Sequence, residues 1–463
     1  MAKTAFLLAA TQSNSGKTTI AMGLMKAFCN MGLNVQPFKV GPDYIDPMYH
    51  TAATGRNSRN LDSFMLEEDT IRYLFEKNSN DADLSIVEGV MGLYDGQGGF
   101  SLKGSSAHIA QLLDLPVILV VNGNGMSLSV AALIKGFQDF SPETKIGGVI
   151  LNQVKNDSGF IHLKEIIETN CKIPVYGYLP KNPQFALNDR HLGLYCSEEI
   201  NDLDEKFERI AEALTEHCDL NRLREDMARV PHDASAPPLP SKIDGSVTIG
   251  YARDSAFNFY YRDSLDLLEE LGATLIPFSP MKDKSLPPMD GVILGGGYPE
   301  LYLEELSANK SFLRDLKEKL EQGLPCFAEC GGLIYLGKTM TIHDKTHELT
   351  GFFPFDFTMT DRLQHFGYME ASIEAGTPLT TEGELSIRGH EFHYTKRIDT
   401  TDYPTSYRVT KKRRTKDVHW EEGYRKQNVL GGYPHFNFYS NPQCAKNLLL
   451  MAKAYHKERL DQK

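Results

Sequence analysis

The nine residues from Thr11 to Thr19, TQSNSGKTT, carry the first pattern whose chemistry can be named. A polar Gly-Lys-Thr loop between a strand and a helix directs backbone N–H groups and the positive end of the helix at phosphate groups. In such a loop Lys17 reaches the β and γ phosphates of a nucleotide, and Thr18 can bind Mg²⁺. The usual loop has Gly where Thr11 stands, and the partition-type variant has Lys where this chain has Gln12. The pattern predicts a nucleotide site formed by Thr11, Ser13, Ser15, Gly16, Lys17, Thr18 and Thr19.

Two turns that carry acidic residues follow, in PFKVGPDYIDP (37–47) and IVEGVMGLYDG (86–96). Ligands of open α/β sheets bind at the carboxyl ends of the strands, so these acidic side chains could hold Mg²⁺ or orient a substrate. Gly-Pro-Asp and Tyr-Asp-Gly are also ordinary turn formers. Two such turns beside a phosphate loop favour a site, whose candidates are Asp43, Asp46, Glu88 and Asp95. Lys39, on the first segment, is either a phosphate partner or a solvated lysine at a strand end.

A cysteine in the second half of the chain has the surroundings of a nucleophile. In LPCFAECGGLIYL (324–336) an apolar strand ends at Ala328 and a Gly-Gly pair opens a helix directly after Cys330. A thiol at a helix N-terminus has a lowered pKa, and the amide of Gly331 can donate to an oxyanion. A buried structural cysteine is the ordinary alternative, and Cys326 fits it. The base for Cys330 should be a histidine distant in sequence, and His435 in GGYPHFNFYSNP is the best candidate.

A glycine run, LGGGYPEL (294–301), also follows an apolar strand. We expect this loop beside the Cys330 turn, where Gly296 would supply a second oxyanion donor.

The elements that position these residues follow from continuous apolar runs, which are typical of buried parallel strands. The first half predicts strands at 4–10, 34–40, 84–87, 116–121 and 147–151 and a helix at 17–31; the second half predicts strands at 247–251, 274–277, 291–294 and 325–328 and helices near 261–271 and 310–322. Pro-rich sequence between them predicts an α/β nucleotide-binding domain at 1–230, a linker at 231–245 and a second α/β domain at 246–463. We expect a parallel sheet with helices on both faces.

The composition of the chain indicates which classes of partner and which compartment are compatible with it. With 49 Lys+Arg against 61 Asp+Glu the chain has a net charge of −12, which argues against a general nucleic-acid binder. The longest apolar stretch, from Leu115, is too short to cross a membrane, and the N-terminus does not resemble a signal peptide. The seven cysteines include no C-x-x-C pair, so we expect reduced thiols and a cytoplasmic protein. A homodimer is an option that the sequence leaves open.

The ordered set of motifs resembles the cobyrinic acid a,c-diamide synthase family. The set is GKTT, PFKVGPDYIDP, VEGVMGLYDG, DRHLGL, ARDSAFNFYY, LGGGYPEL, AECGGLIYL, RGHEFHYT and HFNFYSNP. The resemblance covers nearly the whole chain and implies an ATP-dependent amidoligase domain similar to dethiobiotin synthetase, joined to a triad-type class I glutamine amidotransferase domain. It implies that Cys330 and His435 hydrolyse glutamine and that the phosphate loop and Lys39 bind Mg²⁺ and ATP. It further assigns Asp43, Tyr44, Asp46 and Asp95 to substrate, and Thr18, Asp46 and Glu88 to the metal.

The chain departs from the family pattern in two places. Ala10 and Asn14 stand where glycines are common in the nucleotide loop, and His435-Phe436-Asn437-Phe438 stands where the family often has His-Leu-His-Phe. Many amidotransferases have Glu two residues after the catalytic His, at the position of Asn437. An amide can orient an imidazole but supplies no negative charge, so the third member of the triad stays open.

The activity that the resemblance implies is ATP- and glutamine-dependent amidation of the a and c carboxylates of a cobyrinate-type tetrapyrrole. Sirohydrochlorin or its nickel form is an alternative substrate, because no motif identifies the macrocycle. A partition or signalling ATPase without amidation is a more distant alternative. His390 and His393 in RGHEFHYT suit a structural or tetrapyrrole-facing role better than zinc.

Overall fold

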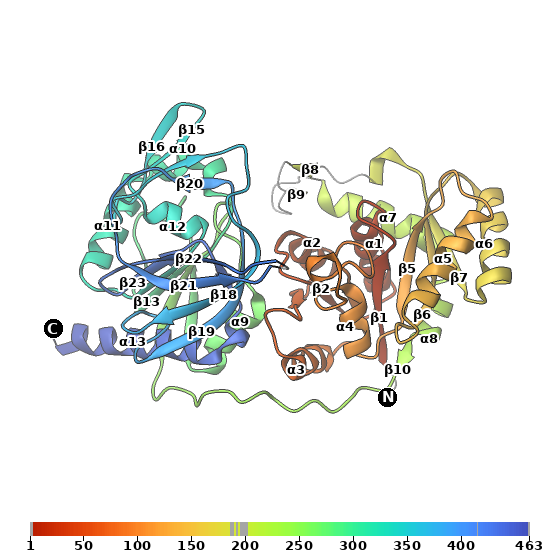
Figure 1. Ribbon diagram of the computed structural model, residues 1–463, viewed down its shortest axis with the longest axis horizontal. Helices are drawn as coiled ribbons and strands as arrows, with labels where there is room; N and C mark the ends of the chain where they lie inside the picture. Colours follow the sequence, from red (N-terminus) through yellow and green to blue (C-terminus); the bar gives the residue numbers. More distant parts are fainter. Residues whose placement is uncertain (1–2, 186–188, 191–192, 195–201, 414, 462–463) are drawn as a thin grey trace. The chain divides into compact units, whose positions relative to one another are not determined.

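The computed structural model describes residues 3–185, 189–190, 193–194, 202–413 and 415–461. The chain divides into two compact units, Met1–Pro237 and Pro238–Lys463, each with its own sheet (Figure 1). Part of the DRHLGL motif (189–194) lies outside the described residues. Cys196 and Arg414 also lie outside them. The six cysteines of the described segments are free thiols. None of the helices in these segments combines the length and the apolar character that a membrane span requires.

The first unit contains a parallel sheet in the order β3-β2-β4-β1-β5-β6-β7, with β10 added antiparallel to β1. Its strands are β1 (Lys3–Ala10), β2 (Val35–Val40), β3 (Arg59–Leu61), β4 (Leu84–Glu88), β5 (Val117–Asn122), β6 (Ile146–Val154), β7 (Val175–Pro180) and β10 (Ala228–Arg229), besides the hairpin β8 (Asp189–Arg190) and β9 (Gly193–Leu194). Its helices are α1 (Lys17–Asn30), α2 (Ile45–Thr54), α3 (Glu68–Ser79), α4 (Ser106–Leu112), α5 (Ser129–Phe140), α6 (Asp157–Cys171), α7 (Leu203–His217) and α8 (Leu220–Asp226), with the 3₁₀ turns η1 (Gln97–Gly99) and η2 (Pro183–Phe185). The predicted α/β fold is confirmed.

The central strands of this sheet consist almost entirely of buried apolar residues, because helices pack against the sheet. The order of the strands brings the carboxyl ends of β1, β2 and β4 together. Lys39 of β2 is the direct register partner of Glu88 of β4. The loops that follow these three strands therefore meet at one edge of the sheet.

The second unit contains a mixed sheet in the order β12-β11-β13-β14-β23-β22-β21-β18-β19-β24. Its strands are β11 (Val247–Ala252), β12 (Ala273–Phe278), β13 (Gly291–Leu294), β14 (Cys326–Glu329), β18 (Phe366–Glu374), β19 (Glu384–Phe392), β21 (Thr405–Lys411), β22 (Val418–Lys426), β23 (Val429–Gly432) and β24 (His435–Phe436). A smaller sheet holds β15 (Thr339–Ile342), β16 (Lys345–Glu348), β17 (Asp356–Met359) and β20 (Thr395–Arg397), and the helices are α9 (Arg262–Glu270), α10 (Leu303–Ala308), α11 (Lys310–Glu321), α12 (Gly331–Leu336) and α13 (Pro442–Asp461), with the turns η4 (Pro299–Leu301) and η5 (Phe438–Ser440).

The parallel half of this sheet, from β12 to β23, contains the four strands that the sequence predicts. The antiparallel half, from β22 to β24, was not predicted apart from the strand-like RGHEFHYT segment, much of which lies in β19. The two halves are joined at the site by Glu329, whose buried carboxyl group accepts a hydrogen bond from the Phe436 N–H at 2.9 Å. This contact connects the end of β14 to β24.

Glu329 gives the fold a testable pH dependence. Burial raises the pKa of Glu329 to about 8, against the opposing effect of the Phe436 N–H. In the unfolded chain the group ionises near its ordinary value, so folding stability associated with it is lost as pH rises from about 4.5 to 8. We expect Glu329→Gln, which keeps an acceptor for Phe436, to gain stability relative to the wild type by roughly 2–5 kcal/mol between pH 5 and pH 8. Thermal unfolding of the full chain at both pH values measures this.

The matched control is Glu382→Gln at an exposed position, for which no such gain is expected. A Glu329→Gln variant whose stability relative to the wild type is the same at both pH values would contradict the protonated, buried carboxyl group.

Candidate functional site

The nucleotide loop connects β1 to α1 and has the backbone of a tight phosphate-binding turn. Asn14 and Gly16 both have positive φ, at 62° and 86°, and Gly16 directly precedes the first turn of α1. The Ser15 hydroxyl donates to the Gln12 carbonyl at 2.9 Å. Asn14 thus takes the left-handed conformation that a glycine would favour, which Asn tolerates better than most residues.

A residue that sequence reasoning missed packs against this loop. Asn152 in β6 donates from its side-chain amide to the Ser15 carbonyl at 2.8 Å. A Cβ atom on Gly16 would lie 2.0 Å from the Asn152 Nδ2 atom, so only glycine fits there. Asn152 is a sequence-distant support for the loop, and no local pattern marks it.

The loop's basic and hydroxyl side chains face the acidic turns. The Thr18 hydroxyl donates to Glu88 Oε1 at 2.7 Å. Burial and the charge of Lys39 lower the pKa of Lys17, although Glu88 and other carboxylates act in the opposite direction. Thr11 and Thr19 are half-buried in this segment and Ser13 is exposed. The structure therefore brings Lys17, Thr18 and Glu88 together.

Lys39 is not a solvated lysine. Its ammonium group is buried, forms an ion pair with Asp46, and lies 3.1 Å from Glu88 Oε1 and 3.9 Å from Asp43 Oδ2. Burial alone would lower the pKa of Lys39, but Asp46 and Glu88 outweigh this effect and raise it above its usual value. Lys39 thus joins the two acidic turns into one cluster.

The three carboxylates of the cluster differ in state. Burial and repulsion by Asp43 raise the pKa of Asp46 to about 8. Burial would also raise the pKa of Glu88, but Lys39 and His50 hold it below its usual value. Because the pKa of Asp46 is raised to about 8, this carboxyl group is protonated near neutral pH unless further positive charge is supplied. A divalent cation bound by Thr18, Asp46 and Glu88 would supply that charge, so the donor set fits Mg²⁺.

The remaining acidic and aromatic candidates lie on the turns themselves. Asp43 Oδ1 accepts from the N–H groups of Ile45 and Asp46 at 2.8 and 3.2 Å, which closes the start of α2. Tyr44 directly precedes that helix and is nearly buried. Asp95 accepts from the Gly92 N–H at 2.9 Å, and this contact closes its own turn. Both aspartates therefore have the turn-forming role that the sequence left as an alternative, whatever they bind in addition.

In the second unit Cys330 occupies a strained position between β14 and α12. Its φ is 46° and its ψ is −101°, which is rare for a residue other than glycine. The Cys330 N–H donates to the Gly432 carbonyl at 2.7 Å, and this bond holds the turn in place. The geometry is that of a nucleophile elbow.

The expected lowering of the Cys330 pKa is wrong. Burial and the neighbouring Glu300 raise the pKa of the thiol well above its usual value, and the Gly331 N–H opposes them only in part. Helix α12 has only six residues. The lowering of the thiol pKa by its N-terminus is smaller than the rise caused by the loss of solvent around the sulfur. Cys330 therefore rests as a neutral thiol.

His435 lies against the glycine loop. A Cβ atom on Gly296 would be 2.4 Å from the His435 Cε1 atom, so the glycine is required for this close approach. The same loop reaches the cysteine turn, because a Cβ atom on Gly331 would be 2.9 Å from Pro299 and 3.4 Å from the Gly297 nitrogen. The structure brings the glycine loop next to both the histidine and the cysteine turn, as the sequence predicts.

Other histidines surround His435. His390 is its register partner across β19 and β24, and the two rings stack with centroids 5.1 Å apart. Burial, followed by the charges of His390 and His393, lowers the pKa of His435 well below its usual value. Burial also lowers the pKa of His390 to about 3. His435 is therefore a neutral imidazole.

Asn437 does not extend a triad in this structure. Its side-chain oxygen accepts from the Tyr439 N–H at 3.0 Å and from the Ser264 hydroxyl at 3.4 Å, and so caps η5 against α9. Its acceptor is committed to these two partners.

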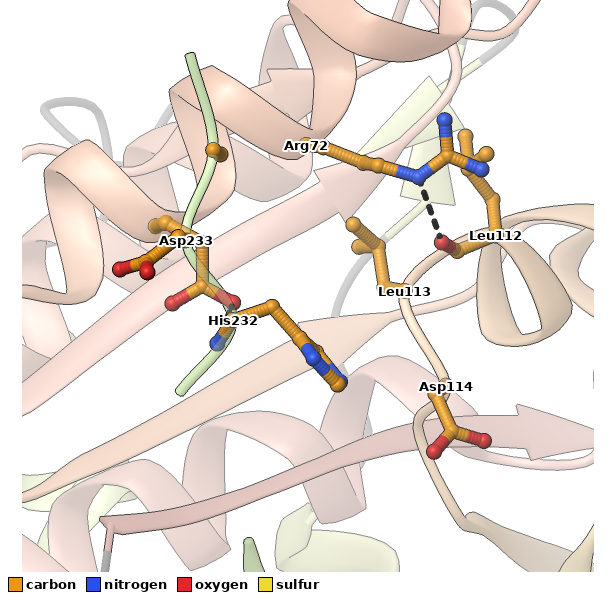
Figure 2. Close-up of a pocket in the computed structure, with 8 residues that line it drawn as sticks. Arg72, Leu112, Leu113, Asp114, His232 and Asp233 are labelled. Atoms are coloured by element: carbon orange, nitrogen blue, oxygen red, sulfur yellow. Dashed lines mark hydrogen bonds between the residues drawn. The ribbon is translucent and has the colours of Figure 1, made fainter. Parts of the chain in front are cut away.

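The pocket in Figure 2 lies on the first unit, apart from these candidates. It is lined by Arg72, Glu76, Leu112, Leu113, Asp114, His232, Asp233 and Ala234, none of which is a predicted site residue. Arg72 Nε donates to the Leu112 carbonyl at 3.3 Å, and Glu76 pairs with Arg229. Arg72 and Glu76, two of its charged groups, therefore already have protein partners.

The loop geometry predicts that Gly16 and a second glycine respond differently to the same change. Gly16→Ala forces a side chain into Asn152, whereas Gly32 has a similar φ of 81° with no atom within 4 Å of an added Cβ. Both variants should lose about 1 kcal/mol of stability from the positive φ. Only Gly16→Ala should weaken binding of a fluorescent ATP analogue, by roughly tenfold or more, or about 1.4 kcal/mol. Equal affinities of the two variants would show that the contact with Asn152 does not shape the loop.

In comparisons with known proteins, two segments of the chain match two different domain families. The CobQ/CobB/MinD/ParA nucleotide binding domain family matches residues 6–193, and the CobB/CobQ-like glutamine amidotransferase domain family matches residues 248–443.

Full-length relatives have one name in common. The cobyrinate a,c-diamide synthase of Listeria monocytogenes is 45% identical over 94% of this chain and 96% of its own length. That of Streptococcus sanguinis is 42% identical over 96% and 98%, and that of Priestia megaterium is 40% identical over the whole of both chains. With identity at this level over nearly its entire length, the chain belongs to the cobyrinate a,c-diamide synthase family.

Proposed function

We propose that this protein amidates the a and c side-chain carboxylates of cobyrinate, with ATP as the energy source and glutamine as the nitrogen donor. The observation that carries the proposal is the presence on one chain of a charged phosphate-loop cluster and a cysteine–histidine site, in a family whose named members are cobyrinate a,c-diamide synthases. Use of ATP, glutamine and a free thiol suits the cytoplasm. A partition or signalling ATPase is disfavoured, because such a protein has no use for the second unit.

The first unit would activate the carboxylate. A carboxylate is a poor electrophile, but its oxygen can attack the γ-phosphorus of ATP, release ADP and form an acyl phosphate. Lys17 and Lys39 would stabilise charge on the transferring phosphoryl group. Ammonia then attacks the acyl carbon and phosphate leaves, so that the amide is formed.

Mg²⁺ belongs to this proposal as the partner of ATP. Thr18, Glu88 and Asp46 would hold it, and when bound it neutralises charge on the phosphates. Within the described part of the chain, no three His, Cys, Asp or Glu side chains form a metal site by themselves. Magnesium usually binds through one or two carboxylates together with substrate phosphates, which agrees with this arrangement. Asp43 and Tyr44 would then contact the substrate, while Asp95 shapes the adjoining loop.

The second unit would release ammonia from glutamine. Cys330 Sγ attacks the side-chain amide carbon while His435 takes the thiol proton and passes it to the departing nitrogen. Ammonia leaves, and water hydrolyses the thioester to glutamate. Amides of the glycine loop and of Gly331 would stabilise the oxyanion. Because thiol and imidazole are both neutral at rest, proton transfer must accompany the attack.

Turnover against a panel of tetrapyrroles tests the proposal. The purified chain is given ATP, Mg²⁺ and glutamine with cobyrinate, sirohydrochlorin or nickel sirohydrochlorin, and the amides gained are counted by mass. Two amides on cobyrinate are expected. Selective amidation of a sirohydrochlorin would identify the alternative substrate, and ATP hydrolysis without amidation of any macrocycle would refute the proposal.

The two units predict opposite responses to the nitrogen source. Cys330→Ala should abolish glutamine-dependent amidation and retain turnover with a high concentration of ammonium salt, because the phosphate loop is unchanged. Lys17→Ala should abolish both, at a cost of several kcal/mol in the barrier. Rates with each donor measure this. Loss of ammonium-driven turnover in Cys330→Ala would contradict the division of labour.

The committed acceptor of Asn437 predicts a graded series in the glutaminase reaction. His435→Ala should lower the rate by orders of magnitude, since the proton acceptor is lost. Asn437→Ala should lower it by roughly tenfold, or about 1.4 kcal/mol, because only the cap of η5 is lost. Ser264→Ala removes one partner of that cap and should be similarly mild. Equal losses in His435→Ala and Asn437→Ala would make Asn437 a true triad member.

A further inference from the structure

A buried histidine that no motif singled out contacts the phosphate-loop cluster. His50 lies on α2, four residues after Asp46 and on the same face of the helix. It is fully buried, and its Nε2 atom is 2.6 Å from Glu88 Oε2. Its Nδ1 atom is 3.1 Å from the Ser58 hydroxyl. The three side chains form a continuous chain of hydrogen bonds, Ser58–His50–Glu88.

The two oxygens of Glu88 have separate partners. Oε1 accepts from the Thr18 hydroxyl at 2.7 Å and from the Lys39 ammonium group at 3.1 Å, whereas Oε2 contacts His50. The last torsion of a glutamate side chain is broad, so contacts at Oε1 alone do not fix the carboxylate plane. A second contact at Oε2 does fix it. His50 therefore determines how Oε1 is presented to Thr18 and Lys39.

The histidine is itself held in one orientation. The Ser58 N–H donates to the Thr51 hydroxyl at 3.0 Å, and that hydroxyl donates to the Pro47 carbonyl at 2.7 Å. Ser58 is thereby attached to α2, the helix that carries His50. Because an ionised carboxylate only accepts, the Nε2–H group donates to Glu88, and Nδ1 is left to bond the Ser58 hydroxyl. No solvent reaches His50 or Glu88 to replace these bonds.

We propose that His50 is a positioning residue for metal–nucleotide binding: it fixes the Glu88 carboxylate in the orientation that a divalent cation beside Thr18 requires, and Ser58 fixes the His50 ring. The inference deepens the proposed function and rests on its assignment of the cation to Thr18 and Glu88. Hydrogen-bond partners of metal-binding carboxylates typically contribute a factor of 10–100 in metal affinity.

Two substitutions at position 50 separate the contact with Glu88 from the contact with Ser58. His50→Gln places an N–H donor at about the distance of Nε2 and can still reach Glu88. His50→Asn places its amide near Nδ1 and can reach only Ser58. Binding of a fluorescent ATP analogue to the full chain is measured as a function of Mg²⁺ concentration, and again in EDTA.

We expect His50→Asn to raise the Mg²⁺ concentration at half-saturation by about tenfold and His50→Gln by about threefold or less. Binding in EDTA should change by less than about twofold in both, because no contact to the nucleotide is lost. Equal effects in the two variants, or equal weakening with and without Mg²⁺, would reduce His50 to a packing residue and overturn the proposal.

Ser58→Ala keeps the inference testable if the position-50 variants do not fold. It removes one hydroxyl group, and we expect about a threefold rise in the Mg²⁺ midpoint; an unchanged midpoint would overturn the role of the chain of hydrogen bonds. These measurements need neither glutamine nor a tetrapyrrole. If the protein fails to amidate cobyrinate but His50→Asn still shifts the midpoint, the proposed function fails and this inference stands.

Discussion

The ion pair network around the buried Lys39 ammonium group is the interaction on which the first unit depends. Removing such a charge from water costs several kcal/mol unless close partners surround it, and here Asp46 and Glu88 do so. The network requires that β2 and β4 be neighbours in register, that α2 begin two residues after Asp43, and that α1 begin at Lys17, directly after Gly16. The same strand order and helix starts that form the sheet therefore also place the charged groups at its edge.

Cys330 and His435 in the second unit are buried and neutral, in contrast to the charged cluster of the first unit. The strain at Cys330 is held by the Gly432 carbonyl. Glycines at 296 and 331 allow the histidine, the cysteine turn and the glycine loop to meet. In the proposed reaction one unit would stabilise highly charged phosphates, whereas the other would keep a thiol protonated until glutamine binds. The chemistry of acyl phosphate formation and of amide hydrolysis calls for such different surroundings.

Much of the fold and of the candidate sites was predictable, because it depends on residues that are close together in the sequence. Continuous apolar runs marked the parallel strands, and the Gly-Lys-Thr and Cys-Gly-Gly turns marked the two sites. Asn152, Glu329 and Ser264 were missed because each acts across more than a hundred residues of sequence. His50 was within reach, since it lies one helical turn after Asp46. The predicted lowering of the Cys330 pKa was wrong, because the effect of burial, which the sequence does not reveal, is larger than the effect of a short helix. The antiparallel half of the second sheet lacks the apolar runs that identify central strands.

If the charged cluster activates a carboxylate by phosphorylation, an oxygen atom of that carboxylate must pass to phosphate, and isotope labelling measures this transfer. Cobyrinate labelled with ¹⁸O in its carboxylates is converted with unlabelled ATP, and the released phosphate is analysed by mass. When ammonia displaces phosphate from an acyl phosphate, the phosphate keeps one oxygen of the original carboxylate. We therefore expect one ¹⁸O atom in the phosphate for each amide formed. Phosphate without ¹⁸O, or label in AMP, would contradict it.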